Sequence, residues 1–130
     1  MGLFKTNKKS KKLANDYWLE LQSLAQFEEL TKESGERPIV IFKHSTRCSI
    51  SHFVHRSLAS NWNFKSGELP FYYLDLIAHR DISNAVADHY GVKHESPQLI
   101  LLYKNQVLYH ASHDAIILDE MKQRLSSSSN

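Results

Sequence analysis

The sequence has little of several features that define common protein classes. Its 130 residues include one cysteine, four glycines and three prolines. A single cysteine excludes an intramolecular disulfide framework, and it excludes a four-cysteine zinc site or iron–sulfur cluster held within one chain. The scarcity of glycine and proline excludes a collagen-like or low-complexity chain. No segment of the sequence approaches the roughly 20 consecutive apolar residues that a membrane-spanning helix needs.

A strong charge of one sign is also missing from most of the chain. There are 16 basic and 14 acidic residues, but five of the lysines fall within the first twelve positions. The remainder, with 11 basic and 14 acidic residues, has a net charge of −3. Domains that bind nucleic acids carry a strongly basic face. We therefore expect no nucleic-acid partner.

The rest of the composition suits one compact unit between two polar ends. Hydrophobic residues make up 42% of the chain and aromatic residues 11%, which is enough for a single core. Residues 1–14 predict a disordered basic tail, and residues 126–130 predict a disordered serine-rich tail. Residues 15–125 are expected to form the folded domain. Because the N-terminus lacks the apolar stretch of a secretory signal, we expect a cytoplasmic protein with no membrane partner.

Strand and helix patterns alternate along the folded part. Short apolar runs predict strands over residues 18–21, 39–42, 70–76, 98–103 and 107–110. Apolar residues at helical spacing predict helices over residues 23–30, 48–62, 81–90 and 114–125. Ser45 or Thr46 is expected to cap the second helix, and Gly91 to end the third. The order βαβαβαββα predicts an α/β fold, with a mixed central sheet and helices on both of its faces.

Cys48 is the candidate reactive residue because it falls where a buried strand gives way to a helix. A helix N-terminus stabilises a thiolate and can hold the pKa of a cysteine well below its ordinary value. Arg47 adds a neighbouring cation, and the hydroxyl of Ser51 is placed to donate to the thiolate across the first turn. Ser51 stands where a Cys-x-x-Cys motif has its second cysteine. A mixed disulfide at Cys48 must therefore be released by an external thiol.

The pair Ser96–Pro97 directly precedes the strand predicted over residues 98–103. A cis peptide bond here would direct the preceding backbone toward a substrate. Only about 5–6% of X–Pro bonds in folded proteins are cis. Spacing alone therefore leaves both isomers open, with trans as the ordinary expectation.

These features together resemble a known family. The element order, the cysteine that opens the helix after the central strand and the proline before the next-to-last strand resemble the thioredoxin fold. Residues 42–51 (FKHSTRCSIS) and 92–98 (VKHESPQ), with Ser112 and His113, resemble the bacillithiol-system redox-active family, also called YtxJ-like proteins or monothiol bacilliredoxins. The resemblance covers about residues 15–125.

The resemblance implies thiol–disulfide exchange, with bacillithiol as a low-molecular-weight co-substrate and no tightly bound cofactor. Cys48 would take bacillithiol from bacillithiolated client proteins, and another bacillithiol or a coupled reductase would regenerate the cysteine. The thioredoxin fold implies a cis Pro97 and a Ser96 backbone that binds the disulfide partner. Family members often have proline where this chain has Ser49, whose N–H is placed to contact the thiolate. We expect a monomer.

Two other functions remain open. Cys48, His52 and His55 are spaced to share a helix face, with His44 nearby, which suits a thioredoxin-like metal carrier. Because the sequence has no Cys-x-x-x-Cys or His-Glu-x-x-His pattern, we assign no metal ligands. The second alternative is a non-catalytic interaction scaffold, whose binding surface would be furnished by Tyr72, Tyr73, Tyr103 and Tyr109.

Overall fold

The computed structural model describes residues 18–128, so the tail predicted for residues 1–14 lies outside the described chain. The strands of the described part are β1 (Leu19–Glu20), β2 (Ile39–His44), β3 (Phe71–Asp75), β4 (Gln98–Tyr103) and β5 (Gln106–Ser112). Its helices are α1 (Leu24–Glu33), α2 (Ser49–Asn61), α3 (Arg80–Tyr90) and α4 (Leu118–Ser128), with a short 3-10 turn, η2 (His113–Ala115), before α4. No helix within residues 18–128 has the length and apolar character needed to cross a bilayer.

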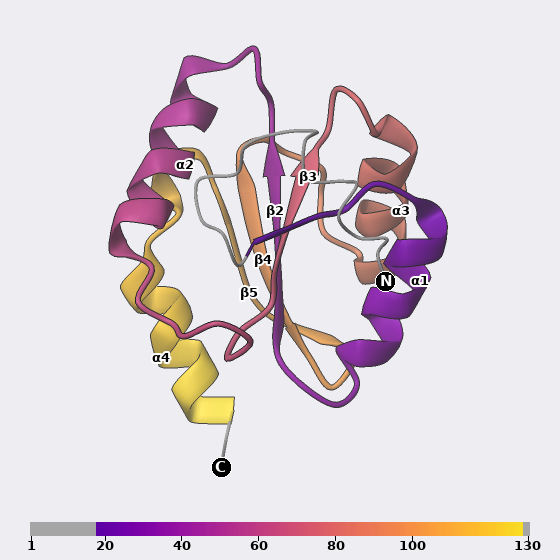
Figure 1. Ribbon diagram of the computed structural model, residues 1–130, viewed down its shortest axis with the longest axis vertical. Coiled ribbons are helices and arrows are strands. Elements are labelled where there is room, and N and C mark those ends of the chain that lie inside the picture. The colour runs from indigo at the N-terminus through magenta and orange to yellow at the C-terminus, as the bar shows by residue number, and fades with distance from the viewer. Residues whose placement is uncertain (1–17, 129–130) are drawn as a thin grey trace.

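The strands form one mixed sheet in the order β1-β3-β2-β4-β5 (Figure 1). β3 runs parallel to both β1 and β2, whereas β4 runs antiparallel to β2 and to β5. This confirms the predicted α/β fold with its antiparallel edge. β2 lies at the centre, and all six of its residues are buried, as expected of a strand covered on both faces.

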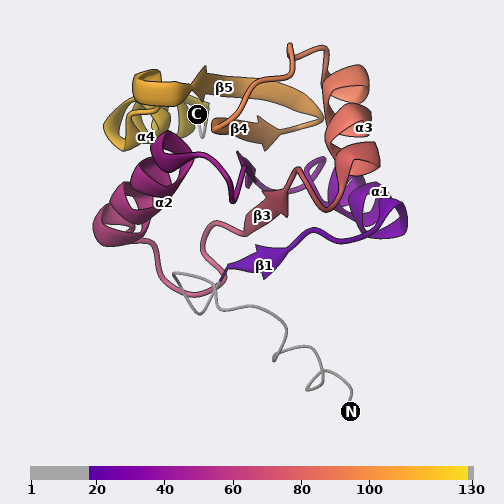
Figure 2. The same ribbon diagram turned by 90° about the horizontal axis from the view of Figure 1, so that it is seen from above.

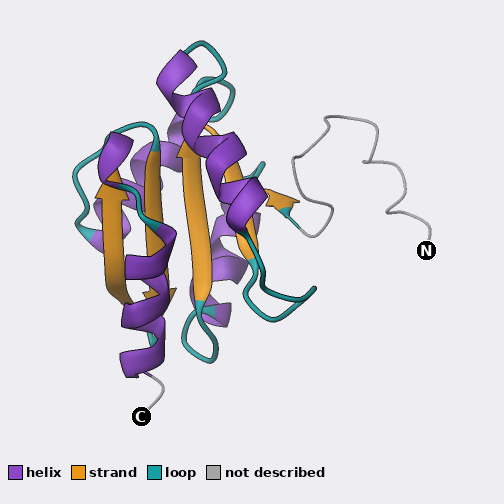
Figure 3. Cartoon of the chain, turned by 90° about the vertical axis from the view of Figure 1, so that its left-hand side faces the viewer, coloured by secondary structure: helices purple, strands orange, loops and turns teal. Residues whose placement is uncertain are grey.

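Helices cover both faces of the sheet. Figures 2 and 3 show α2 and α4 on one face, with α1 and α3 on the other. Successive residues of β2 point to opposite faces, so Val40 and Phe42 join the core beneath α2 and α4. Ile39 and Ile41 join the core beneath α1 and α3. One strand therefore contributes alternately to two separate hydrophobic clusters.

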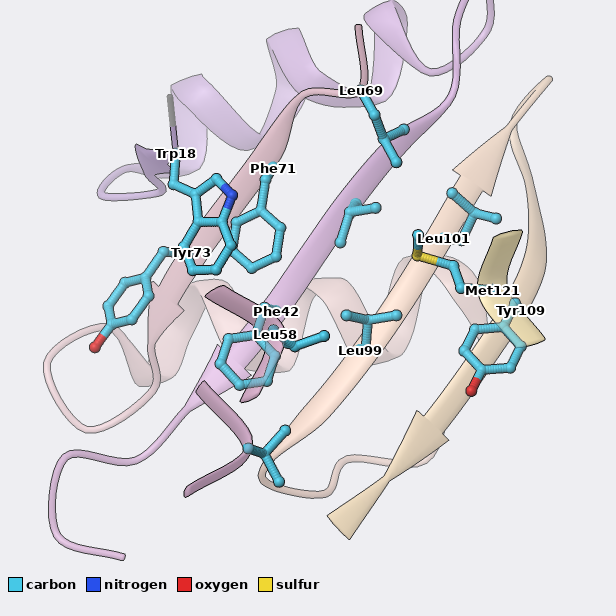
Figure 4. Packing of buried hydrophobic residues seen from close by; sticks show 12 residues of the cluster. Trp18, Phe42, Leu58, Leu69, Phe71, Tyr73, Leu99, Leu101, Tyr109 and Met121 are labelled. Atoms are coloured by element: carbon cyan, nitrogen blue, oxygen red, sulfur yellow. The ribbon is translucent and has the colours of Figure 1, made fainter. Parts of the chain in front are cut away.

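The cluster beneath α2 and α4 is rich in aromatic side chains (Figure 4). Trp18 stacks on Phe71 with ring centroids 3.7 Å apart, and the edge of Trp62 contacts Phe71 at 5.1 Å. Stacked and edge-to-face rings add attraction beyond the burial of their area. The opposite cluster is mostly aliphatic. The two faces of the sheet thus differ in chemistry as well as in position.

Most element boundaries follow the prediction, and the exceptions have local causes. Gly91 ends α3 in the left-handed conformation with φ of 67°, as predicted. Cys48 itself is the N-cap of α2, so the expectation that Ser45 or Thr46 would cap it was wrong. β5 continues to Ser112, and His113 (φ 57°) then starts η2 instead of a long helix.

The last helix is displaced toward the C-terminus relative to the prediction. Because η2 occupies residues 113–115, α4 begins only at Leu118 and then continues to Ser128. Residues 126–128 therefore belong to a helix, so the prediction of a disordered tail there was wrong. Residues 129–130 lie outside the described chain.

Candidate active site

Cys48 occupies the junction between β2 and α2. Its backbone is extended, with φ of −114° and ψ of 122°, and its carbonyl accepts the first helical hydrogen bond from the His52 N–H at 3.1 Å. Its own N–H donates to the Ser45 carbonyl at 3.2 Å, which closes a tight turn ahead of the helix. The side chain is partly exposed and makes no capping hydrogen bond. The sulfur therefore lies beside the unpaired N–H groups of a helix start while still open to a reactant.

Ser51 is placed beneath the Cys48 turn. Its side chain is fully buried, and its Oγ accepts the N–H of Ser45 at 3.0 Å and lies 2.6 Å from Nδ1 of His44. The hydroxyl thus ties the turn before Cys48 to the first turn of α2. Within residues 18–128 no hydrogen bond joins it to the sulfur, so the donation expected from the sequence is not observed.

His44 determines where the Ser51 proton points. If Nδ1 of His44 lacks a proton, the Ser51 hydroxyl donates to it, and if Nδ1 carries a proton, the hydroxyl accepts and its own proton is available to another acceptor. The sequence pattern indicates His44 near the cysteine only as a metal-ligand candidate. Strand alternation gave the missing signal, because it puts His44 on the same face of β2 as Phe42, the face that α2 covers.

Aromatic rings surround His44. Its ring centroid lies 4.9 Å from that of His52, 5.0 Å from that of His55 and 5.3 Å from that of Tyr73. Burial and the neighbouring His52 lower the pKa of His55. Burial, followed by Asp75 and Glu20, raises the pKa of Tyr73. Both pKa shifts favour the uncharged forms of His55 and Tyr73, the two rings that pack against His44.

The histidines near Cys48 do not form a metal centre. Nε2 of His52 lies 2.9 Å from the Thr46 carbonyl oxygen, and Nδ1 of His44 is engaged by Ser51. Across residues 18–128, no group of three or more His, Cys, Asp or Glu side chains is arranged to hold a metal ion. The geometry of the described residues therefore does not favour the metal-carrier alternative.

Ser96 and Pro97 form the opposite wall of the site. The peptide bond between them is cis, as the resemblance implied. Lys43 near the end of β2 pairs in register with Gln98 at the start of β4. Cys48 follows the C-terminal end of β2, and Pro97 precedes the N-terminal end of β4. Because the two strands are antiparallel and paired in this register, both residues lie at the same end of the sheet. The Pro97 carbonyl accepts the His113 N–H at 2.9 Å, and the buried Ser96 Oγ has no hydrogen-bond partner among the described residues.

A buried lysine supports the loop that carries Ser96 and Pro97. Nζ of Lys43 lies 3.1 Å from Nδ1 of His94 and 3.2 Å from the Ser83 carbonyl oxygen. Burial lowers the pKa of Lys43 to about 8. A charged ammonium only donates, so Nδ1 of His94 accepts and its ring proton lies on Nε2. The loop is thereby tied to the centre of the sheet two residues before Ser96.

Arg47 and Ser49 flank Cys48 on the surface. Both are exposed, and the Arg47 guanidinium makes no hydrogen bond or salt bridge to any other residue within 18–128. Its backbone N–H donates to the Ser45 Oγ at 3.3 Å. Ser49 is the first residue of α2. The structure therefore keeps both residues next to the cysteine in the chain without a side-chain contact that fixes them on the sulfur.

Comparison with solved structures supports the fold assignment. A protein with a thioredoxin fold, assigned only provisionally as an oxidoreductase, is 25% identical with a TM-score of 0.69, over 88% of this chain and 98% of its own. Thioredoxin from Malassezia sympodialis is 17% identical with a TM-score of 0.65, over 87% and 91%. Thioredoxin from Trypanosoma brucei brucei is 15% identical with a TM-score of 0.63, over 91% and 94%. The last two likenesses concern the fold alone.

A family model provides the more specific match. The family described as monothiol bacilliredoxin BrxC matches residues 19–121, which include Cys48, Ser51, Ser96 and Pro97. Its name and the thioredoxin fold are those of thiol oxidoreductases, in keeping with a single cysteine at a helix start. The chain belongs to the monothiol bacilliredoxin family.

Proposed function

We propose that this protein removes bacillithiol from mixed disulfides of client proteins, with Cys48 as the nucleophile. The observation that carries the proposal is the position of Cys48, at the N-cap of α2 and at the same end of the sheet as the cis Ser96–Pro97 bond. Family membership supports the choice of thiol. The reaction takes place in the cytoplasm, and the protein acts as a monomer.

The exchange proceeds in two balanced steps. The Cys48 thiolate attacks the bacillithiol sulfur of the client disulfide, a new disulfide forms, and the client sulfur leaves with the electron pair and takes a proton from solvent. A second bacillithiol thiolate then attacks the bacillithiol sulfur on Cys48. This step releases oxidised bacillithiol and restores the Cys48 thiolate. The client cysteine is reduced, and two bacillithiol molecules become one disulfide.

The remaining residues support the thiolate and the incoming disulfide. We assign the N–H groups of Ser49 and Ser51, at the start of α2, to stabilising negative charge on sulfur. Arg47 adds a solvent-exposed positive charge nearby. Backbone groups of Ser96 bind the disulfide partner across from Cys48. The Ser51 hydroxyl is free to donate a hydrogen bond toward the sulfur only when Nδ1 of His44 is protonated.

Intact-protein mass spectrometry tests the reaction. Reduced protein is incubated with a bacillithiolated client, in parallel with a glutathionylated client and with the Cys48→Ser variant. We expect the mass of one bacillithiol to appear on the wild-type protein, with recovery of the client thiol and little transfer from the glutathione disulfide. Absence of transfer from both clients would contradict the proposal, and equal transfer from both would contradict the choice of thiol.

A second measurement tests the reactivity of Cys48 without any disulfide substrate. We expect iodoacetamide to alkylate Cys48 faster than free cysteine at mildly acidic pH, because a helix N-terminus favours the thiolate. A rate equal to that of free cysteine under the same conditions would contradict the activated thiolate.

A further inference from the structure

A groove of about 760 Å³ lies between α2 and the segment from η2 into α4. Its floor contains Val54 and Leu58, which also belong to the aromatic core cluster. Its rim carries three large apolar side chains that face solvent: Phe53 is 65% exposed, Ile50 is 53% exposed and Ile117 is 44% exposed. Contiguous exposed apolar surface of this kind marks a binding surface.

The groove adjoins both walls of the candidate active site, which are the start of α2 and the loop that carries Pro97. Ile50, on its rim, is two residues from Cys48 on α2. His113, also on the rim, donates its backbone N–H to the Pro97 carbonyl. A client peptide joined to Cys48 by a disulfide therefore has the residues next to its own cysteine beside this groove.

We propose that the groove binds the client polypeptide next to its modified cysteine, accepting an apolar side chain followed by a basic one. The inference rests on the proposed function, since it names the part of the client that the protein recognises. An apolar side chain of the client covers Phe53, Ile50 and Ile117, which otherwise face solvent. The preference for a basic residue comes from the charges on the rim.

The rim presents two unpaired carboxylates. Asp114 and Asp119 line the groove, and within residues 18–128 neither makes a hydrogen bond or salt bridge. The nearby Lys122 is already engaged, because its Nζ donates to the Asn63 Oδ1 at 2.8 Å and lies 5.5 Å from the ring of Phe64. The rim therefore carries two carboxylates and one ammonium that is held toward Asn63, so its net charge is negative, which favours a basic partner side chain.

The experiment compares three short peptides whose single cysteine carries bacillithiol. One has leucine and arginine beside the cysteine, one has leucine and aspartate, and one has two serines. Initial rates are measured for the wild-type protein, for Phe53→Ala and for Ile117→Ala. Leu24→Ala is the matched control, because Leu24 is 46% exposed and lies on α1, on the opposite face of the sheet.

We expect the wild-type protein to have the lowest KM for the leucine–arginine peptide. Phe53→Ala and Ile117→Ala should each raise this KM about tenfold with little change in kcat, which corresponds to about 1.4 kcal/mol. Leu24→Ala should leave it unchanged. Replacing both carboxylates, Asp114→Asn with Asp119→Asn, should remove the preference for arginine over aspartate. Reduction of bis(2-hydroxyethyl) disulfide, which is too small to need the groove, should be the same in every variant.

Two results would overturn the groove proposal: an equal KM for all three peptides, or an equal loss of bis(2-hydroxyethyl) disulfide reduction in the groove variants. A separate binding measurement uses the leucine–arginine peptide with serine in place of its cysteine, followed by fluorescence anisotropy. Weaker binding by Phe53→Ala supports the groove even if no bacillithiol is released, an outcome in which only the proposed function fails. Binding unaffected by Phe53→Ala contradicts the groove.

Discussion

Lys43 and His44 are consecutive residues of β2, both almost fully buried, and they support opposite walls of the site. Lys43 points toward the face of α3, where it donates to the Ser83 carbonyl of that helix and to His94 in the loop after it. His44 points toward α2, where it engages Ser51. The first pair holds the loop that carries Pro97, and the second holds the turn that carries Cys48.

The two supports differ in what they can do chemically. A lysine ammonium only donates, so its hydrogen-bonding role is fixed as long as it is charged. An imidazole nitrogen either donates or accepts, so the contact between His44 and Ser51 has two forms. The loop of Pro97 is therefore held in one way, whereas the turn of Cys48 is held by a group able to redirect a proton. Changes on the two faces should therefore have different signatures.

The largest effect is expected from Ser51→Ala. This change leaves the buried Nδ1 of His44 and the partly buried N–H of Ser45 without the oxygen that they contact. A buried group left unpaired costs about 1–3 kcal/mol and a partly buried one costs less, so the free energy of unfolding should fall by about 2–3 kcal/mol. Urea unfolding measures it. Ser60→Ala, an exposed site on the same helix, controls for the higher helix propensity of alanine, and an equal loss in both variants would contradict the role of Ser51.

The second effect concerns Lys43 and depends on pH. Burial lowers its pKa from 10.5 to about 8, so between these values the unfolded chain binds more protons than the folded protein. Stability of the wild-type protein should therefore rise with pH in this window, by up to about 1.4 kcal/mol per pH unit. Lys43→Met lacks this gain, so the stability of the wild type relative to this variant should rise between pH 7.5 and pH 10.

Urea unfolding at several values between pH 7.5 and pH 10 measures the difference. The range ends there because Tyr72, whose pKa is raised to about 12 by burial and by Glu33, has the opposite effect at higher pH. Lys65→Met, at an exposed position, should show no change in this window. A stability difference between wild type and Lys43→Met that is constant with pH would contradict a buried, titrating lysine.

The third prediction addresses the proton-directing role of His44. His44→Asn keeps an amide near the position of Nδ1, whereas His44→Phe removes the hydrogen bond to Ser51 while retaining a planar ring. Because His44→Phe removes the nitrogen that competes for the Ser51 proton, we expect it to raise the rate of Cys48 alkylation at pH 6 with a flatter dependence on pH, and His44→Asn to lie between this variant and the wild type. If both variants have the same pH profile as the wild type, the contact of His44 with Ser51 does not affect the sulfur.

The fold was largely predictable because its signals are local. The uninterrupted apolar run of residues 39–42 marks the central strand, and Gly91 marks a helix end through its left-handed backbone. The beginning of α4 was mistaken because His113, a residue that rarely has a positive φ, starts a separate 3-10 turn. No spacing rule signals that break.

The site was only partly predictable. The position of Cys48 at a helix start followed from the order of strand and helix. The roles of His44 and Ser51 did not, because the partner of a buried hydroxyl depends on how β2 and α2 pack. The pairing of Lys43 with His94 joins residues 51 positions apart and leaves no periodic pattern. Contacts between elements, unlike the elements themselves, require the assembled sheet.

The smallest effect is expected from Arg47→Ala. Because the Arg47 side chain is exposed and makes no fixed contact within residues 18–128, its influence on Cys48 acts through solvent. Alkylation of Cys48 should slow by about twofold at low ionic strength, and the difference should vanish near 1 M salt, where screening acts within about 3 Å. Arg56→Ala, at an exposed position about two turns into α2, should change the rate less. A loss that persists at high salt would show that Arg47 holds the sulfur by direct contact, and the wall of Cys48 would then have a surface support in addition to the buried one.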